Sequence, residues 1–94
     1  MKLHQKGYLL VELSKVASMW DYELVSKSLT EYQLSGQYWI NTLRVALEEL
    51  AAAGLVTRIG EQLDDGRHAG QGKVLFNYQL SEFGRTRMRD TGLL

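Results

Sequence analysis

The chain contains no cysteine and no proline, and it has only two histidines, His4 and His68. Without cysteine it forms neither disulfides nor thiolate metal sites, and it lacks a cysteine nucleophile. Because the two histidines lie sixty-four positions apart in the sequence, a histidine-based zinc site is close to excluded. No Ser-His-Asp arrangement can be argued from them either, so we expect neither an enzyme nor a bound metal or cofactor.

Long hydrophobic runs and an excess of one charge are also missing. The longest apolar stretches span a few residues, such as Tyr8 to Val11, and the first residues lack the hydrophobic region of a signal peptide. We therefore expect a cytoplasmic protein that does not bind a membrane. Eleven Lys and Arg residues balance eleven Asp and Glu residues, so a charged surface patch must arise in the fold. The length of 94 residues predicts a single domain, 1–94.

The first third of the chain predicts two helices separated by a short break. Leucines at helical spacing indicate a first helix over residues 3–17. Ser18, Met19 and Trp20 then interrupt the pattern, and Asp21 is a candidate N-terminal cap. A second, shorter helix is predicted over residues 21–29, followed by a turn region over residues 30–36.

The clearest helix is predicted over residues 37–53, where Leu43, Leu47 and Leu50 belong to one apolar stripe. Ser35 is a reasonable N-terminal cap for this helix. Gly54 stands where a C-terminal cap belongs, because glycine adopts the left-handed conformation that ends many helices.

The last third predicts a hairpin and a final helix. Residues 55–61 favour a strand, and residues 74–80 alternate between apolar and polar side chains as a half-buried strand does. The glycine-rich residues 62–72 form the connection, in which Asp64-Asp65-Gly66 indicates a turn rather than a calcium site. Ser81 is the expected cap of a helix over residues 82–90.

This order of elements predicts an α+β fold that is mainly α. Three helices would pack against a two-stranded antiparallel wing, and a short C-terminal helix would follow. That arrangement is the winged helix-turn-helix.

Two segments carry a resemblance to a known superfamily. Residues 42–56 read TLRVALEELAAAGLV, which resembles the recognition helix and first wing strand of bacterial winged-helix regulators. Residues 78–85 read YQLSEFGR, which is similar to the second wing strand and following helix of PadR-like and MarR-like repressors. The resemblance implies double-stranded DNA as the partner, with the helix over residues 37–53 in the major groove and the wing over residues 55–80 on flanking DNA.

The candidate DNA-binding residues are side chains that can donate hydrogen bonds to phosphates or base edges. They are Gln37, Tyr38, Asn41, Thr42 and Arg44 on the helix, and Arg67, His68 and Lys73 in the wing. Arg44 is the best helix cation, since residues 37–53 contain no other Lys or Arg. The alternative interpretation is that these residues do not contact DNA. The helix residues would then form an ordinary polar face, and the wing residues would belong to a solvated loop.

A second hypothesis is a winged-helix module that binds a protein instead of DNA. The zero net charge, the pair Glu48-Glu49 and the acidic wing residues favour it, because carboxylates repel phosphates. A subunit of a larger complex is a third, weaker possibility. As a regulator the protein would act as a homodimer, and the first helix has the widest apolar surface for a dimer interface, including Leu3, Tyr8, Leu9 and Leu10.

Overall fold

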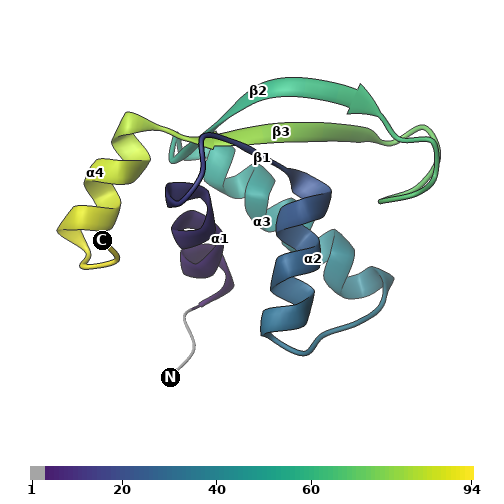
Figure 1. Cartoon of the computed structure of the whole chain (residues 1–94), viewed down its shortest axis with the longest axis horizontal. Helices are drawn as coiled ribbons and strands as arrows, with labels where there is room; N and C mark the ends of the chain where they lie inside the picture. The colour runs from purple at the N-terminus through teal and green to yellow at the C-terminus, as the bar shows by residue number, and fades with distance from the viewer. Residues whose placement is uncertain (1–3) are drawn as a thin grey trace.

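The computed structural model describes residues 4–94, which form an α+β structure that is mainly α (Figure 1). The elements are α1 (Gln5–Ser14), β1 (Met19–Trp20), α2 (Asp21–Glu31), α3 (Gln37–Ala52), β2 (Val56–Leu63), β3 (Val74–Leu80) and α4 (Glu82–Asp90). The strands form one antiparallel sheet in the order β1-β3-β2. Figure 1 shows the β2–β3 hairpin lying across α1, α2 and α3, with its connecting loop at one end of the molecule and α4 at the other.

The strand β1 was not expected, because the sequence predicts a break and a helix cap at this point. Met19 pairs with Tyr78 and Trp20 pairs with Asn77, both on β3. The sheet therefore has three strands, not the two of the predicted wing. A strand of two residues is too short to produce a periodic pattern, and this one depends on pairing with a segment almost sixty positions away.

Two predicted helix caps are also wrong. The residue before α2 is Trp20, which makes no side-chain capping bond, and Asp21 lies inside the helix with its carboxylate buried. The cap position of α3 is Gly36 and not Ser35, and its φ of 102° is open to glycine at little cost. By contrast, the predicted cap Ser81 is confirmed, since its hydroxyl accepts a hydrogen bond from the Gly84 N–H at 2.9 Å.

The end of α3 follows the prediction closely. Gly54 adopts a φ of +80°, its N–H donates to the carbonyl oxygen of Ala51, and the N–H of Leu55 donates to that of Leu50. These two bonds are the Schellman motif, which satisfies carbonyl groups that the helix leaves free. The chain then enters β2 directly, so Gly54 links the helix to the hairpin.

The core lies between the helices and the sheet. The predicted stripe of α3 is confirmed, because Leu43 and Leu47 are fully buried and Leu50 is nearly so. Tyr78 contributes the largest fully buried side chain from the sheet. The alternation predicted for β3 fails at its start, where Val74 is partly exposed and its neighbour Leu75 is buried.

The first helix departs from the prediction both in its length and in which of its side chains are exposed. It ends at Ser14 instead of residue 17, and Val16 beyond it is 40% exposed. Leu9 and Leu10 are buried in the protein's own core, and the ring of Tyr8 packs edge-on against Tyr32 at 5.6 Å. These leucines cannot also form a dimer interface, which corrects the prediction for this helix. Leu3, the fourth residue of that prediction, lies outside the described residues.

Candidate nucleic-acid interface

The N-terminal half of α3 presents a polar face to solvent. Gln37, Tyr38 and Asn41 are exposed and Thr42 is half-buried, so the structure brings four of the predicted residues together. The Gln37 side-chain amide donates a hydrogen bond to the Asn41 side-chain oxygen at 2.9 Å, and the Thr42 hydroxyl donates to the Tyr38 carbonyl at 2.8 Å. The first of these bonds still leaves the Asn41 amide hydrogens and the Gln37 oxygen available to an external partner.

Arg44 does not share this exposed face. Its side chain is 16% exposed, and its Nη2 atom donates a hydrogen bond to the carbonyl oxygen of Val74 at 2.6 Å. The same nitrogen lies 3.6 Å from Oδ2 of Asp21. Arg44 therefore connects α3 to the start of β3 and to the first turn of α2.

Asp21 is the buried carboxylate of this connection. Its Oδ2 atom accepts a hydrogen bond from the backbone N–H of Phe76 at 3.2 Å. Burial raises the pKa of Asp21 above its usual value, although the Phe76 hydrogen bond and the charge of Arg44 act in the opposite direction. An acidic residue at the start of a predicted helix was the one local sign of Asp21, and helical spacing does not predict its pairing with Arg44.

A second buried carboxylate, Asp64, organises the loop between β2 and β3. Its two oxygens accept hydrogen bonds from the backbone N–H groups of Gly66, His68, Ala69 and Gly70, at 2.6 to 3.3 Å. Burial acts to raise the pKa of Asp64, but these four N–H groups outweigh it and hold the pKa well below its usual range. Residues 4–94 contain no group of three or more His, Asp or Glu side chains placed to hold a metal ion.

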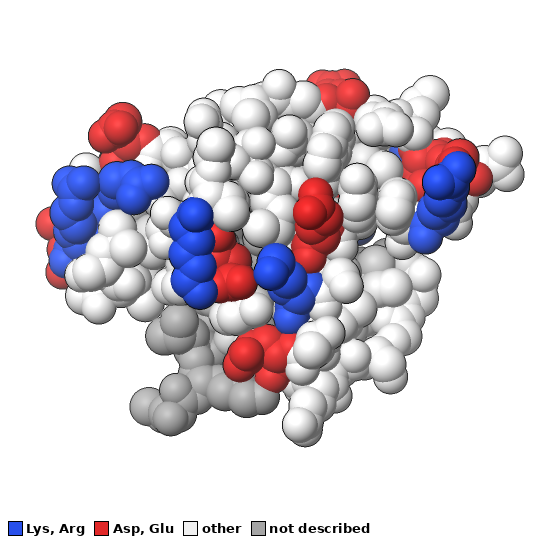
Figure 2. All heavy atoms as spheres, in the orientation of Figure 1, with Lys and Arg blue, Asp and Glu red and all other residues white. Residues whose placement is uncertain are grey.

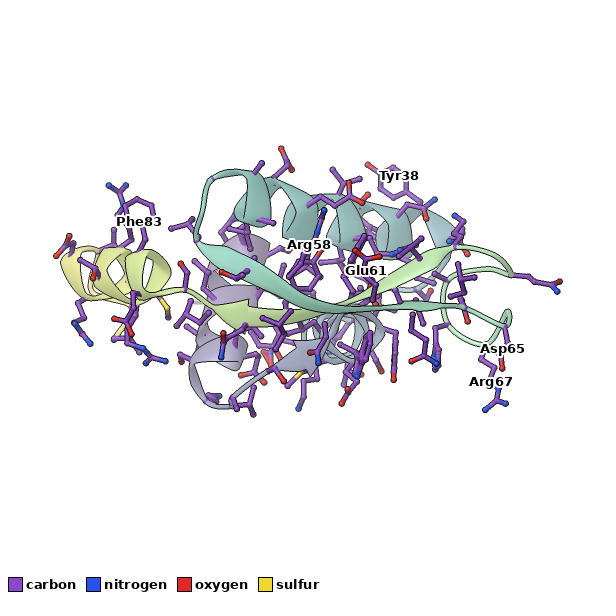
Figure 3. The ribbon with its side chains drawn as sticks, turned by 90° about the horizontal axis from the view of Figure 1, so that it is seen from above. Tyr38, Arg58, Glu61, Asp65, Arg67 and Phe83 are labelled. Carbon is purple, nitrogen blue, oxygen red and sulfur yellow. The ribbon has the colours of Figure 1, made fainter. Side chains whose placement is uncertain are left out.

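The loop folds back towards α2. The ring of His68 stacks on that of Tyr22 with 3.7 Å between centroids, and Tyr22 stacks in turn on Trp20 at 6.2 Å. At the tip of the loop, Arg67 makes an exposed ion pair with Asp65 at 2.8 Å, and both residues point away from the body of the protein (Figure 3). Lys73 is exposed and has no ion pair within residues 4–94.

Three predicted residues meet around a hollow instead of on the outer face. Arg44, Arg67 and His68 line a hollow of about 240 Å³ between α2, α3 and the loop, together with apolar side chains that include Val25 and Ile40. The eight predicted residues therefore divide into three groups: four on the face of α3, three around this hollow, and Lys73 at the base of the loop.

Charges of both signs lie side by side on the face seen in Figure 2. Most Lys and Arg side chains there are next to Asp or Glu side chains, and positive side chains gather mainly over α4, which contains Arg85, Arg87 and Arg89. Lys6 lies 3.5 Å from Glu49 of α3, and Lys15 and Lys27 both approach Glu12. Much of the positive charge near the helices is thus neutralised within the chain.

Sequence reasoning missed one exposed cation beside α3. Arg58 on β2 places its guanidinium 4.2 Å from the centre of the Phe76 ring, and Figure 3 shows its side chain on the α3 side of the sheet. The predicted strand over residues 55–61 contains Arg58, but the strand pattern does not show that its side chain lies beside α3. The hairpin therefore carries Arg58 as a second exposed cation in addition to Lys73.

Comparisons with models of known protein families, with curated proteins and with solved structures find no match. Among the helices of residues 4–94, none is long and apolar enough to cross a bilayer.

Proposed function

We propose that the protein is a winged-helix DNA-binding protein that acts as a transcriptional regulator. The N-terminal half of α3 enters the major groove, and the β2–β3 hairpin contacts flanking DNA as a wing. The observation that carries this proposal is the exposed polar face of Gln37, Tyr38 and Asn41, on a helix whose opposite side is fixed in the core.

The chemistry of this face suits base edges. Glutamine and asparagine amides pair with adenine in the major groove, and the exposed Tyr38 hydroxyl can donate to a phosphate. Because α3 has 16 residues, it is about 24 Å long, so the exposed face of its N-terminal half can enter a groove while Leu43 and Leu47 pack on the opposite side. The stripe of Leu43 and Leu47 holds that geometry rigidly.

The hairpin also supports the proposal despite the third strand. Strand β1 pairs only with Asn77 and Tyr78 of β3, so the hairpin beyond these residues remains two-stranded. Lys73 and Arg58 are the cations of this hairpin that have no carboxylate partner within residues 4–94. Arg44, the residue first expected to contact DNA, acts here as a positioning residue, since its bond to Val74 ties the hairpin to α3.

A protein partner is the second candidate, and a specific surface favours it. Tyr38 is 71% exposed and Val45 is 50% exposed, and both line a hollow of about 460 Å³ between α3 and residues 4–6. Exposed apolar side chains next to an internally neutralised ion pair, Lys6–Glu49, are typical of a protein contact.

Selection from a random duplex DNA library at low salt, followed by titration of the selected duplex, tests the first proposal. A Gln37→Ala/Asn41→Ala double variant is expected to bind that duplex ten- to a hundredfold more weakly, about 1–3 kcal/mol. Asp90→Asn, at an exposed position of α4 outside both α3 and the hairpin, is the control and should bind like the wild type. No affinity of the wild-type protein for any duplex at low salt would contradict DNA binding and favour the protein partner.

A further inference from the structure

The hollow of about 240 Å³ between α2, α3 and the loop of the hairpin has the size of a small-molecule site. Part of its lining is apolar, since Val25, Leu29 and Ile40 contribute to it and Val25 is buried. An apolar cavity of about 150 Å³ can hold a benzene molecule, so this hollow has room for roughly ten non-hydrogen atoms.

Arg44 brings unused hydrogen-bond donors to this lining. Its Nη2 atom donates to the Val74 carbonyl oxygen, whereas within residues 4–94 its Nε and Nη1 groups donate to no acceptor. No nitrogen of Arg44 is among the buried side-chain atoms that lack a partner, so these donors are open to solvent. A guanidinium in this state can bind an acceptor on a ligand that occupies the hollow.

The charges at the hollow favour a singly charged anion. Arg67 also lines the hollow, but its guanidinium pairs with Asp65 and points away from the body of the protein (Figure 3). The carboxylate of Asp21, 3.6 Å from Arg44, offsets part of the positive charge that remains. A carboxylate therefore suits Arg44 better than a doubly charged phosphate, and its bonds to a guanidinium are strong because both partners are charged.

We propose that this hollow binds a small monocarboxylic acid with an apolar chain. The carboxylate accepts hydrogen bonds from Arg44, and the chain packs against Val25, Leu29 and Ile40. A polar molecule of the same size would lose its hydrogen bonds to water against these apolar side chains, and an amine would be repelled by Arg44. The lining does not include Gln37 or Asn41, so the bound acid leaves the polar face of α3 free.

Titration of the ¹⁵N-labelled protein with octanoate, followed by nuclear magnetic resonance, tests the site. The backbone amides of Ser26, Ile40 and Arg44 are expected to shift and to saturate with a Kd of about 1 mM or below. Octylammonium and 1-octanol have the same chain without the carboxylate, and each is expected to bind at least about tenfold more weakly. Equal affinity for 1-octanol, or inorganic phosphate that shifts the same amides as strongly as octanoate, would overturn the proposal.

Variants of α3 separate the site from general binding of an apolar chain. Ile40→Glu places a carboxylate one turn before Arg44, where it competes for the same donors, and is expected to weaken octanoate binding at least about tenfold. Val45→Glu makes a similar change at an exposed position that does not line the hollow and should bind octanoate like the wild type.

Arg44→Met removes the donors themselves and should weaken octanoate binding as Ile40→Glu does. Far-ultraviolet circular dichroism shows whether each variant is folded. Wild-type affinity for octanoate in a folded Ile40→Glu or Arg44→Met variant would refute the site. Since no assay involves DNA, the result is independent of the proposed function.

Discussion

The imidazole ring of His68 lies flat on the phenol ring of Tyr22, with 3.7 Å between the centroids and 10° between the planes. This contact joins the loop of the hairpin to the first turn of α2, forty-six positions away in the sequence. A wing that projects freely would leave its histidine available to a partner, whereas here the histidine is engaged within the chain.

Replacing the stacked ring should loosen the loop without unfolding the protein. His68→Ala is expected to reduce stability by about 0.5–1.5 kcal/mol, the usual contribution of an aromatic pair. Hydrogen exchange should accelerate at the backbone amides of Ala69 and Gly70, while α3 keeps its protection. Gln71→Ala, at an exposed position of the same loop, is the control. Unchanged exchange in the loop would show that the stack does not hold it.

Acid should destabilise the protein partly through Asp64. The pKa of this carboxyl is lowered in the folded state, so its contribution to stability is present above the ordinary aspartate pKa of about 4 and is lost as the pH falls through the folded-state value. Denaturant titrations between pH 6 and pH 2 should show a smaller acid loss for Asp64→Asn than for the wild type. Asp65→Asn, which alters the exposed partner of Arg67, is the control and should lose stability with acid as the wild type does. Identical acid losses for Asp64→Asn and the wild type would refute this assignment.

Arg44 and Asp21 should be energetically coupled, so that the effect on stability of replacing one depends on the presence of the other. Arg44→Met is expected to cost about 1–3 kcal/mol, because it leaves the buried carboxylate without its cation and the Val74 carbonyl without its donor. The pKa of Asp21 is already raised, so this loss should shrink at acid pH, where the carboxyl is protonated. Adding Asp21→Asn should recover part of the loss in a double-mutant cycle. Lys6→Met, which removes an exposed ion pair, is the control and should have almost no effect on stability. Additive losses for Arg44→Met and Asp21→Asn in the cycle would argue against coupling.

Leu47 tests the orientation of α3. This side chain is fully buried in the middle of the apolar stripe, so Leu47→Ala should reduce the free energy of unfolding by about 2–5 kcal/mol. Val45→Ala, two positions away and half-exposed, should change it by less than about 0.5 kcal/mol. Urea denaturation measures both changes in the free energy of unfolding. A loss below about 1 kcal/mol for Leu47→Ala would contradict the orientation of α3 in which Leu47 faces the core.

Lys73 tests the role of the hairpin in DNA binding. Lys73→Ala should weaken binding to all duplexes by a similar factor and reduce the slope of log affinity against log salt by about one. Lys15→Ala removes a lysine that already pairs with Glu12 and should leave the slope unchanged. A change confined to one DNA sequence would indicate base contact rather than phosphate contact.

The sequence patterns correctly predicted those features of the fold that depend on residues close together in the chain. The leucine stripe of α3, the glycine at its end and the cap Ser81 each follow from residues within a few positions of one another, and the structure has them as predicted. The strand β1 was missed because two residues carry no period, and it exists only through pairing with Asn77 and Tyr78.

The candidate site was less predictable than the fold. The outward positions of α3 followed from helical spacing, which placed Gln37 and Asn41 correctly on the exposed face. Arg44 was assigned to the same face, but a buried carboxylate twenty-three positions earlier draws it inwards. Such a partner depends on how α2 packs against α3, and sequence spacing does not reveal it.

The backbone bonds that Asp64 accepts have a consequence for any partner of the hairpin. Because the loop takes its shape from contacts inside the chain, the entropy of ordering it is lost during folding and does not oppose a later association. The loop backbone that carries Arg67 and Lys73 is therefore already ordered before a partner binds. Affinity at this end of the molecule will depend on how well the partner matches that fixed shape, and little on the ability of the loop to adapt.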